Sequence, residues 1–118
     1  MPETEVIFFK DRDGTEPFSA WLDRQSPKVQ KKCLRVLKNL EDNGHELRRP
    51  RADYLRDGIH ELRIQHLRVQ YRILYFFGGK QVAVVSHGLS KEEKVPERDI
   101  AKALARKADY EQDPERHF

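Results

Sequence analysis

The chain has 118 residues, of which 37% are hydrophobic and 36% charged, and its formal net charge is +3. This length suits one domain, residues 1–118, and the composition excludes both a disordered tail and a strongly cationic protein that coats DNA without specificity. No apolar run approaches the roughly 18 residues that span a bilayer, and the acidic N-terminus lacks the basic region of a signal peptide, so we expect a soluble protein inside the cell.

The first part of the chain predicts a strand followed by two helices. Residues 5–10 form the strand, which a polar turn with a glycine ends. Pro17 marks the start of one helix, and Ser26-Pro27 marks the start of the next. Gly44 closes this second helix, whose apolar side chains recur at helical spacing and include the single cysteine: Val29, Cys33, Val36, Leu37 and Leu40.

A basic segment, residues 45–58, follows the helices and predicts a connecting loop. It places four arginines around an aromatic ring: Arg48, Arg49, Arg51 and Arg56. We interpret Tyr54 and Leu55 as residues that rest on the core. The charge of the loop instead predicts a surface that binds a polyanion, beside the hairpin that follows.

Residues 58–77 alternate at period two, which predicts two antiparallel strands joined by a turn near His66. One face is apolar and takes Leu62 and Ile64 from the first strand. The opposite face bears Arg63, Arg68 and Arg72. This outer face is either solvated or an anion-binding surface, because each guanidinium presents a planar fork of donors. His60 and His66 are interpreted as exposed.

Residues 81–89 predict a further strand, with apolar side chains on both of its faces, as in a central strand that is covered from both sides. Pro96 begins a last helix, and Ile100 and Leu104 belong to its buried stripe. Residues 113–118 are expected to fray. No histidine pairs with a carboxylate at metal-ligand spacing, so no metal site is expected.

Several short motifs occur together in this order. They are Glu61-Leu62-Arg63, then Tyr-Arg-Ile-Leu-Tyr at 71–75, then His-Gly-Leu-Ser-Lys at 87–91, and then Pro96 with a helix that carries Ala103 and Tyr110. In these motifs the chain resembles the RelE/ParE toxins, and most closely their HigB-like, phage-derived branch. The resemblance implies an α+β fold, with two N-terminal helices on a twisted, mainly antiparallel sheet of about four strands, plus a C-terminal helix.

The resemblance also implies a function. Such a chain would be the toxin of a type II toxin–antitoxin system, an endoribonuclease that cleaves mRNA on the ribosome without a metal ion or other cofactor. The ribose 2′-hydroxyl attacks the adjacent phosphate, so the site needs a base, an acid and cations. The residues that match the family's motifs are Arg63 and Arg72 as phosphate clamps, Lys91 as a clamp or proton donor, His87 as acid or base, and Tyr110 on the last helix.

The remaining cations are expected to contact RNA or the ribosome: Arg48, Arg49, Arg51, Arg56, Arg68 and Lys94. Two positions depart from the family's motif, since Leu89 stands in place of an aromatic residue and Glu92 in place of a second lysine. For His87 an alternative stays open, in which it is a strand-end histidine that only bonds to a neighbouring loop. Whether Tyr110 is catalytic or packs the helix also stays open.

The resemblance implies a small acidic antitoxin as partner, of helix-turn-helix type, so that contact with DNA would be indirect. The implied location is the cytoplasm of a prokaryote, with a phage as a possible source of the gene. Two other functions remain open: a ParE-like, non-catalytic inhibitor of DNA gyrase, and a decayed toxin that acts as a binding or regulatory module. His87 and Lys91 favour the ribonuclease over the gyrase inhibitor, whereas Glu92 is the residue that suits a decayed toxin.

Overall fold

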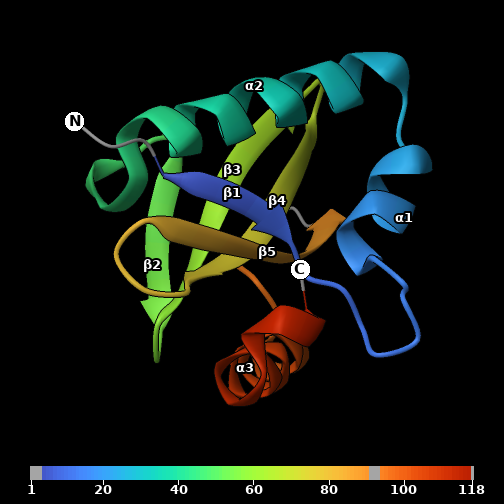
Figure 1. Cartoon of the computed structure of the whole chain (residues 1–118). Helices are drawn as coiled ribbons and strands as arrows, with labels where there is room; N and C mark the ends of the chain where they lie inside the picture. The colour runs from blue at the N-terminus through green and yellow to red at the C-terminus, as the bar shows by residue number, and fades with distance from the viewer. Residues whose placement is uncertain (1–3, 91–93, 118) are drawn as a thin grey trace.

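A five-stranded mixed sheet organises the chain, whose computed structural model describes residues 4–90 and 94–117. The strands are β1 (Glu5–Phe8), β2 (Ala52–Arg56), β3 (Ile59–His66), β4 (Val69–Phe77) and β5 (Val82–Ser90). Their order across the sheet is β1-β5-β4-β3-β2, with β1 parallel to β5 and every other neighbouring pair antiparallel (Figure 1). The α+β class is confirmed, but the sheet has one strand more than the four expected.

The additional strand is β2, which lies in the segment predicted as a loop. It pairs antiparallel with β3, with Ala52 opposite Leu62 and Tyr54 opposite His60. The loop prediction was wrong because Ala52–Arg56 shows no regular alternation of apolar and polar residues. An edge strand needs only one neighbour, and here β3 supplies the hydrogen-bonding partner that the local sequence does not reveal.

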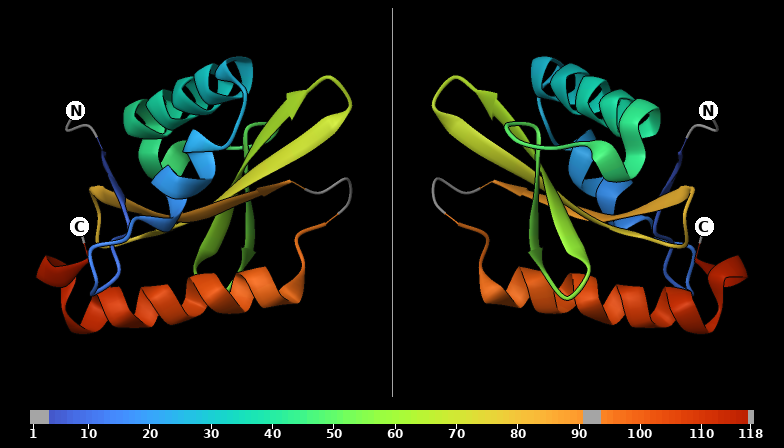
Figure 2. Two further views of the ribbon diagram at one scale, coloured as in Figure 1. Left: turned by 90° about the vertical axis from the view of Figure 1, so that its right-hand side faces the viewer. Right: turned by 90° about the vertical axis from the view of Figure 1, so that its left-hand side faces the viewer.

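The helices cover both faces of the sheet. Figures 1 and 2 show α1 (Pro17–Asp23) and α2 (Pro27–Asn43) on one face and α3 (Glu97–Gln112) on the other. Ser26 caps α2, because its hydroxyl accepts a hydrogen bond from the Val29 backbone N–H at 3.3 Å. Gly44 ends α2 with a φ of +54°, as the sequence predicted for this glycine. Within the described residues, no helix is long and apolar enough to cross a bilayer.

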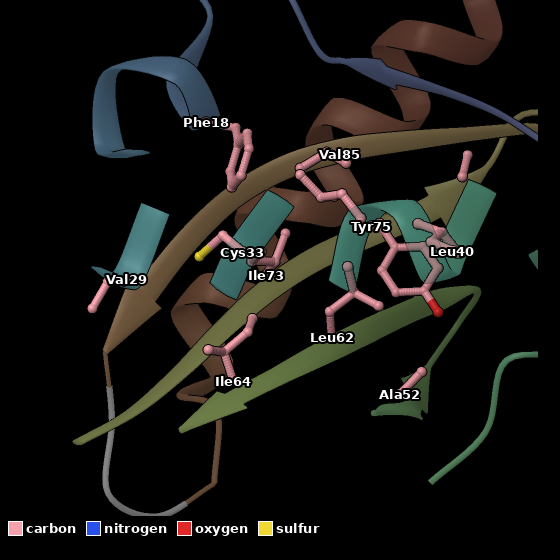
Figure 3. Close-up of a cluster of buried hydrophobic side chains, with 12 residues drawn as sticks. Phe18, Val29, Cys33, Leu40, Ala52, Leu62, Ile64, Ile73, Tyr75 and Val85 are labelled. Carbon is pink, nitrogen blue, oxygen red and sulfur yellow. The ribbon is translucent and has the colours of Figure 1, made fainter. Parts of the chain in front are cut away.

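Each face of the sheet has its own hydrophobic core. Figure 3 shows part of the core beneath α1 and α2, to which Leu62, Ile64 and Cys33 belong, so the predicted core face of the hairpin is confirmed. A second core lies between the sheet and α3 and contains Leu74, Phe76 and Ile100, among others. Strand β5 contributes Val85 to the first core and Val84 to the second, so the prediction of a central strand covered from both sides is confirmed.

The C-terminal residues are docked on the protein. Pro114–Arg116 forms a short 3-10 helix, η2, and the His117 side chain that follows is 1% exposed. Its ring stacks on Phe9 with the centroids 4.7 Å apart, and its Nδ1 donates a hydrogen bond to the Lys10 carbonyl at 2.7 Å. Residues 113–117, expected from the sequence to fray, are folded here against the residues that directly follow β1, which lie more than a hundred positions earlier in the chain.

Candidate functional site

A groove of about 430 Å³ opens on the α3 side of the β3–β4 hairpin. Arg63 lines it from β3, Arg72 from β4, and Lys94 from the segment that leads into α3. Two carboxylates, Asp53 and Glu61, also line it, so its three described cations exceed its acids by one. Three residues that the sequence selected for phosphate or RNA contact therefore meet in one place, which we call the cationic groove.

Glu61 organises the two arginines of this groove. Arg63 and Arg72 are directly opposite in the β3–β4 ladder, so both project from the same face of the sheet. Glu61 accepts hydrogen bonds from Nη1 of Arg72 at 2.7 and 2.8 Å, and Nε of Arg63 lies 3.4 Å from Glu61 Oε1. The carboxylate thus offsets the repulsion between two like charges and orients Arg72.

The two arginines differ in access to solvent. The Arg72 side chain is 6% exposed and its partner Glu61 3%, whereas the Arg63 side chain is 36% exposed. The prediction that Arg72 lies on an outer face was wrong, because that face of the sheet is covered by α3 and the segment leading into it. Arg63 and Lys94 are therefore the more accessible cations of the groove, and Arg72 lies beneath them as one half of a buried ion pair.

His87 is buried beneath α3. It follows a bulge in β5, where Leu74 pairs with His87 while Tyr75 pairs with Val85. Its Nε2 lies 3.1 Å from Oδ1 of Asp99, and its Nδ1 lies 3.1 Å from Nη1 of Arg106; both partners belong to α3. A guanidinium only donates, so Nδ1 is an acceptor and the imidazole proton sits on Nε2, directed at the carboxylate.

This environment keeps the His87 imidazole neutral. Burial lowers the pKa of His87 from 6.5 to about 4, with a further lowering by the charge of Arg106, and the hydrogen bond to Asp99 offsets only part of this. A neutral imidazole is too weak an acid to protonate a leaving group, and the acceptor Nδ1 of His87 is already bonded to Arg106. The geometry favours the alternative in which His87 is a hydrogen-bonded structural residue.

Tyr110, another predicted catalytic residue, lies away from the cationic groove. Tyr110 is near the C-terminal end of α3, where its ring packs on Phe76 with the centroids 5.9 Å apart. A Cβ added to Gly78 would lie 2.6 Å from Cε2 of Tyr110, so the tyrosine also covers the β4–β5 turn. Its place at that turn favours a packing role over a catalytic one. Lys91 lies outside the described residues.

Arg48 and Arg49 border a second hollow, on the opposite side of the edge strand β2 from the cationic groove. Tyr54 and His60 line it as well, and Asp53 borders both hollows. Arg49 donates to Oδ2 of Asp53 at 2.8 Å, and this bond lowers the pKa of the carboxyl group. Two arginines predicted to contact RNA therefore lie beside the groove, at the same edge of the sheet.

The aromatic residues of this edge differ from their predicted placement. Tyr54, interpreted as resting on the core, is 56% exposed. His60 is half-buried and stacks on Tyr75 with the centroids 5.2 Å apart, and His66 is also half-buried, so both predictions of exposed histidines were wrong. Burial lowers the pKa of His60, as do the nearby charges of His45 and Arg48.

The other predicted RNA contacts are dispersed. Arg56 pairs with Asp57 and with Glu97 at the start of α3. Arg51 is exposed just before β2, and Arg68 is exposed in the turn of the β3–β4 hairpin, which projects from the body of the protein (Figure 2). Arg56 lines a neighbouring hollow that shares Lys94 with the cationic groove, whereas Arg51 and Arg68 do not line that groove.

Three residues of this region were missed by sequence reasoning. Glu61 carried a signal, since its place in the alternating strand puts it on the same face as Arg63. The sequence signal for Asp99 and Arg106 was weaker: their spacing of seven residues indicates only that they share one face of a helix. Nothing in the local sequence says that this face meets His87. In the described part of the chain, no group of three or more His, Cys, Asp or Glu side chains is placed to hold a metal ion.

Comparison with known proteins agrees with the motifs at the level of the superfamily. The family model described as phage derived protein Gp49-like (DUF891) matches residues 20–108, which is well over half of the chain. This family belongs to the RelE/HigB-like toxin superfamily, so that level of the expected resemblance is confirmed. A search among curated proteins finds no match. The fold, the order of the motifs and the family match lead to one conclusion, that the chain belongs to the phage-derived Gp49-like family.

Proposed function

We propose that the protein is the toxin of a type II toxin–antitoxin system and that it cleaves mRNA on the ribosome without a metal ion. Membership of the Gp49-like family supports a toxin at the coarse level. The observation that carries the specific activity is the cationic groove, where Arg63, Arg72 and Lys94 meet. Fixed cations that converge on one hollow stabilise the extra negative charge that a phosphate acquires in the transition state.

In the proposed reaction the ribose 2′-oxygen forms a bond to the adjacent phosphorus, and the bond from phosphorus to the 5′-oxygen breaks. The 2′-hydroxyl loses its proton to solvent water and the 5′-oxygen gains one from the proton donor, so the products are a 2′,3′-cyclic phosphate and a 5′-hydroxyl end. Arg63 and Lys94 would bind the non-bridging oxygens, because they are the accessible cations. Arg72, which lies beneath these two cations and is oriented by Glu61, would add positive charge to the floor of the groove. Lys91 keeps the role of proton donor that its place in the motif implies.

We assign His87 a positioning role in this reaction. Its hydrogen bond to Asp99 ties β5 to the first turns of α3. The segment directly before α3 carries Lys94 over the cationic groove. The bond thus holds that cation in place.

The first experiment is inducible expression in bacteria, with growth recorded and transcript 5′ ends mapped. The test variant is Arg63→Ala, because Arg63 is partly exposed and its loss should leave the fold intact. Arg35→Ala is the matched control, since Arg35 is exposed on α2, on the opposite face of the sheet. Removing one positioned cation is expected to reduce cleavage by about a hundredfold or more.

The outcomes separate the three candidate functions. Growth arrest with new frame-dependent mRNA ends, lost in Arg63→Ala and kept in Arg35→Ala, would support the ribonuclease. Arrest without new ends would replace it with an inhibitor that acts by binding, such as the ParE-like inhibition of DNA gyrase. No arrest by the wild type would favour a decayed toxin.

We further propose that a small acidic antitoxin of helix-turn-helix type covers the cationic groove. The exposed arginines around the groove support this partner, since opposite charges steer association. Co-expression with the product of an adjacent gene tests it. Binding that is weaker for Arg63→Ala than for Arg35→Ala would support the proposal, and equal binding would place the antitoxin elsewhere.

A further inference from the structure

Tyr54 is a large aromatic side chain that is both exposed and held in place. It is 56% exposed on the edge strand β2. Its phenol oxygen accepts a hydrogen bond from the Gly58 backbone N–H at 2.9 Å, and its ring meets that of His60 edge to face, with the centroids 5.0 Å apart. An exposed ring with restricted motion presents a flat apolar surface that loses little conformational freedom on binding.

Tyr54 lies where hollows of the surface meet. It lines the second hollow, of about 370 Å³, together with Arg48 and Arg49. It also lines a third hollow, of about 500 Å³, which shares Lys94 with the cationic groove. A chain that occupied the cationic groove and continued around the edge of the sheet would therefore pass over this ring.

The groups around the ring suit a single-stranded nucleotide. Arg48 and Arg49 are exposed cations that can contact a backbone phosphate. Burial lowers the pKa of His60, which favours the neutral form of this ring beside the tyrosine. An aromatic platform beside cations that follow a backbone is how proteins bind single strands, because every base has a face that can stack.

We propose that Tyr54 is a stacking platform for a base of single-stranded RNA whose neighbouring phosphate lies in the cationic groove. This inference rests on the proposed function and deepens it, since it assigns a second contact to the same RNA. The competing occupant is a protein, because tyrosine and arginine are also common at the centres of protein interfaces. RNA is favoured here because the ring is continuous with the groove proposed for the phosphate.

The test measures binding of a short, labelled 2′-O-methyl oligoribonucleotide by fluorescence anisotropy. This probe keeps its bases and phosphates but has no 2′-hydroxyl to react. Tyr54→Leu keeps apolar bulk without a π face, and it should weaken binding by at least about fivefold, the lower end for the loss of one stacked base. Tyr54→Phe keeps the ring and should stay within about twofold of the wild type, because stacking needs only the π face. Thermal unfolding of each variant checks that the fold is kept.

Two further measurements separate stacking from charge. An abasic oligomer of the same length should bind the wild type and Tyr54→Leu equally, because it offers no base. The logarithmic salt dependence of binding should fall by about 0.7 in Arg48→Ala, as expected for the loss of one contact to a single-strand phosphate. In Tyr54→Leu the salt dependence should stay unchanged while the affinity falls.

The results distinguish failure of the stacking proposal from failure of the proposed ribonuclease function. If Tyr54→Leu binds the normal oligomer as tightly as the wild type does, while Arg63→Ala still abolishes mRNA cleavage, the stacking platform is refuted and the ribonuclease stands. If the wild type neither binds the oligomer nor cuts transcripts, both proposals fail. If Tyr54→Leu keeps RNA affinity and loses the antitoxin instead, the ring belongs to a protein interface and the inference is overturned.

Discussion

Replacement of His87 by glutamine should make the stability of the protein less sensitive to acid. In the folded state the pKa of His87 is about 4, against an ordinary value of 6.5. The unfolded chain therefore binds a proton between these two pH values and the folded chain does not, so protonation favours unfolding as the pH falls through this window. The contribution of neutral His87 to the free energy of unfolding is fully present above pH 6.5 and is completely lost below about pH 4.

The size of the effect follows from the two pKa values. Their difference, from 6.5 to about 4, corresponds to about 3 kcal/mol. His87→Gln has no imidazole to titrate, and its amide can still donate to Asp99. The free energy of unfolding of the wild type should therefore fall with acid by about 3 kcal/mol more than that of the variant.

Chemical denaturation at a series of pH values measures this difference, since all other titrating groups are common to both proteins. Nuclear magnetic resonance gives a direct check, because the ring protons of His87 should keep the chemical shifts of the neutral form from neutral pH down to about pH 5. Either of two results would refute the reasoning that burial lowers the pKa of His87. One is an unfolding free energy that depends on pH equally in the wild type and His87→Gln, and the other is a His87 ring that titrates at its ordinary pKa. The second result would also restore His87 as a candidate general acid.

Three further predictions concern the interior. Arg72→Ala leaves the buried charge of Glu61 without this partner and should lower the free energy of unfolding by about 3–5 kcal/mol, measured by urea denaturation; an unchanged midpoint would contradict the burial of the pair. Gly88→Ala would place a Cβ 2.4 Å from Cε3 of Trp21, so it should destabilise by about 1–3 kcal/mol, and a thermal midpoint equal to that of the wild type would disprove the close packing. Burial raises the pKa of the Cys33 thiol to about 11, so a thiol reagent should label it at neutral pH only after unfolding, and rapid labelling of the native protein would count against this.

The sequence by itself determined the elements whose residues repeat at a regular period. The alternation along residues 61–75 predicted β3 and β4 and placed Leu62 and Ile64 on the core side. Helical spacing and a capping Ser-Pro pair predicted α2. Such patterns are sufficient because the period of the side chains along one element follows from its local backbone geometry. The same alternation placed Arg63 and Arg72 together on the face opposite Leu62 and Ile64, whereas Arg68 lies in the turn.

The tertiary structure decided which of these residues are buried and which groups they meet. Residues of β2 form a strand because they pair with β3, which their own sequence does not indicate. Helix α3 and the segment before it cover the arginine face of the hairpin, so this face lines a groove instead of lying open to solvent. The pKa of His87 is lowered by burial beneath α3 and by the charge of Arg106, and the hydrogen bond to Asp99, from the same helix, offsets part of this. Burial, ion pairing and pKa shifts arise between segments distant in the chain, and no local pattern records which segments will touch.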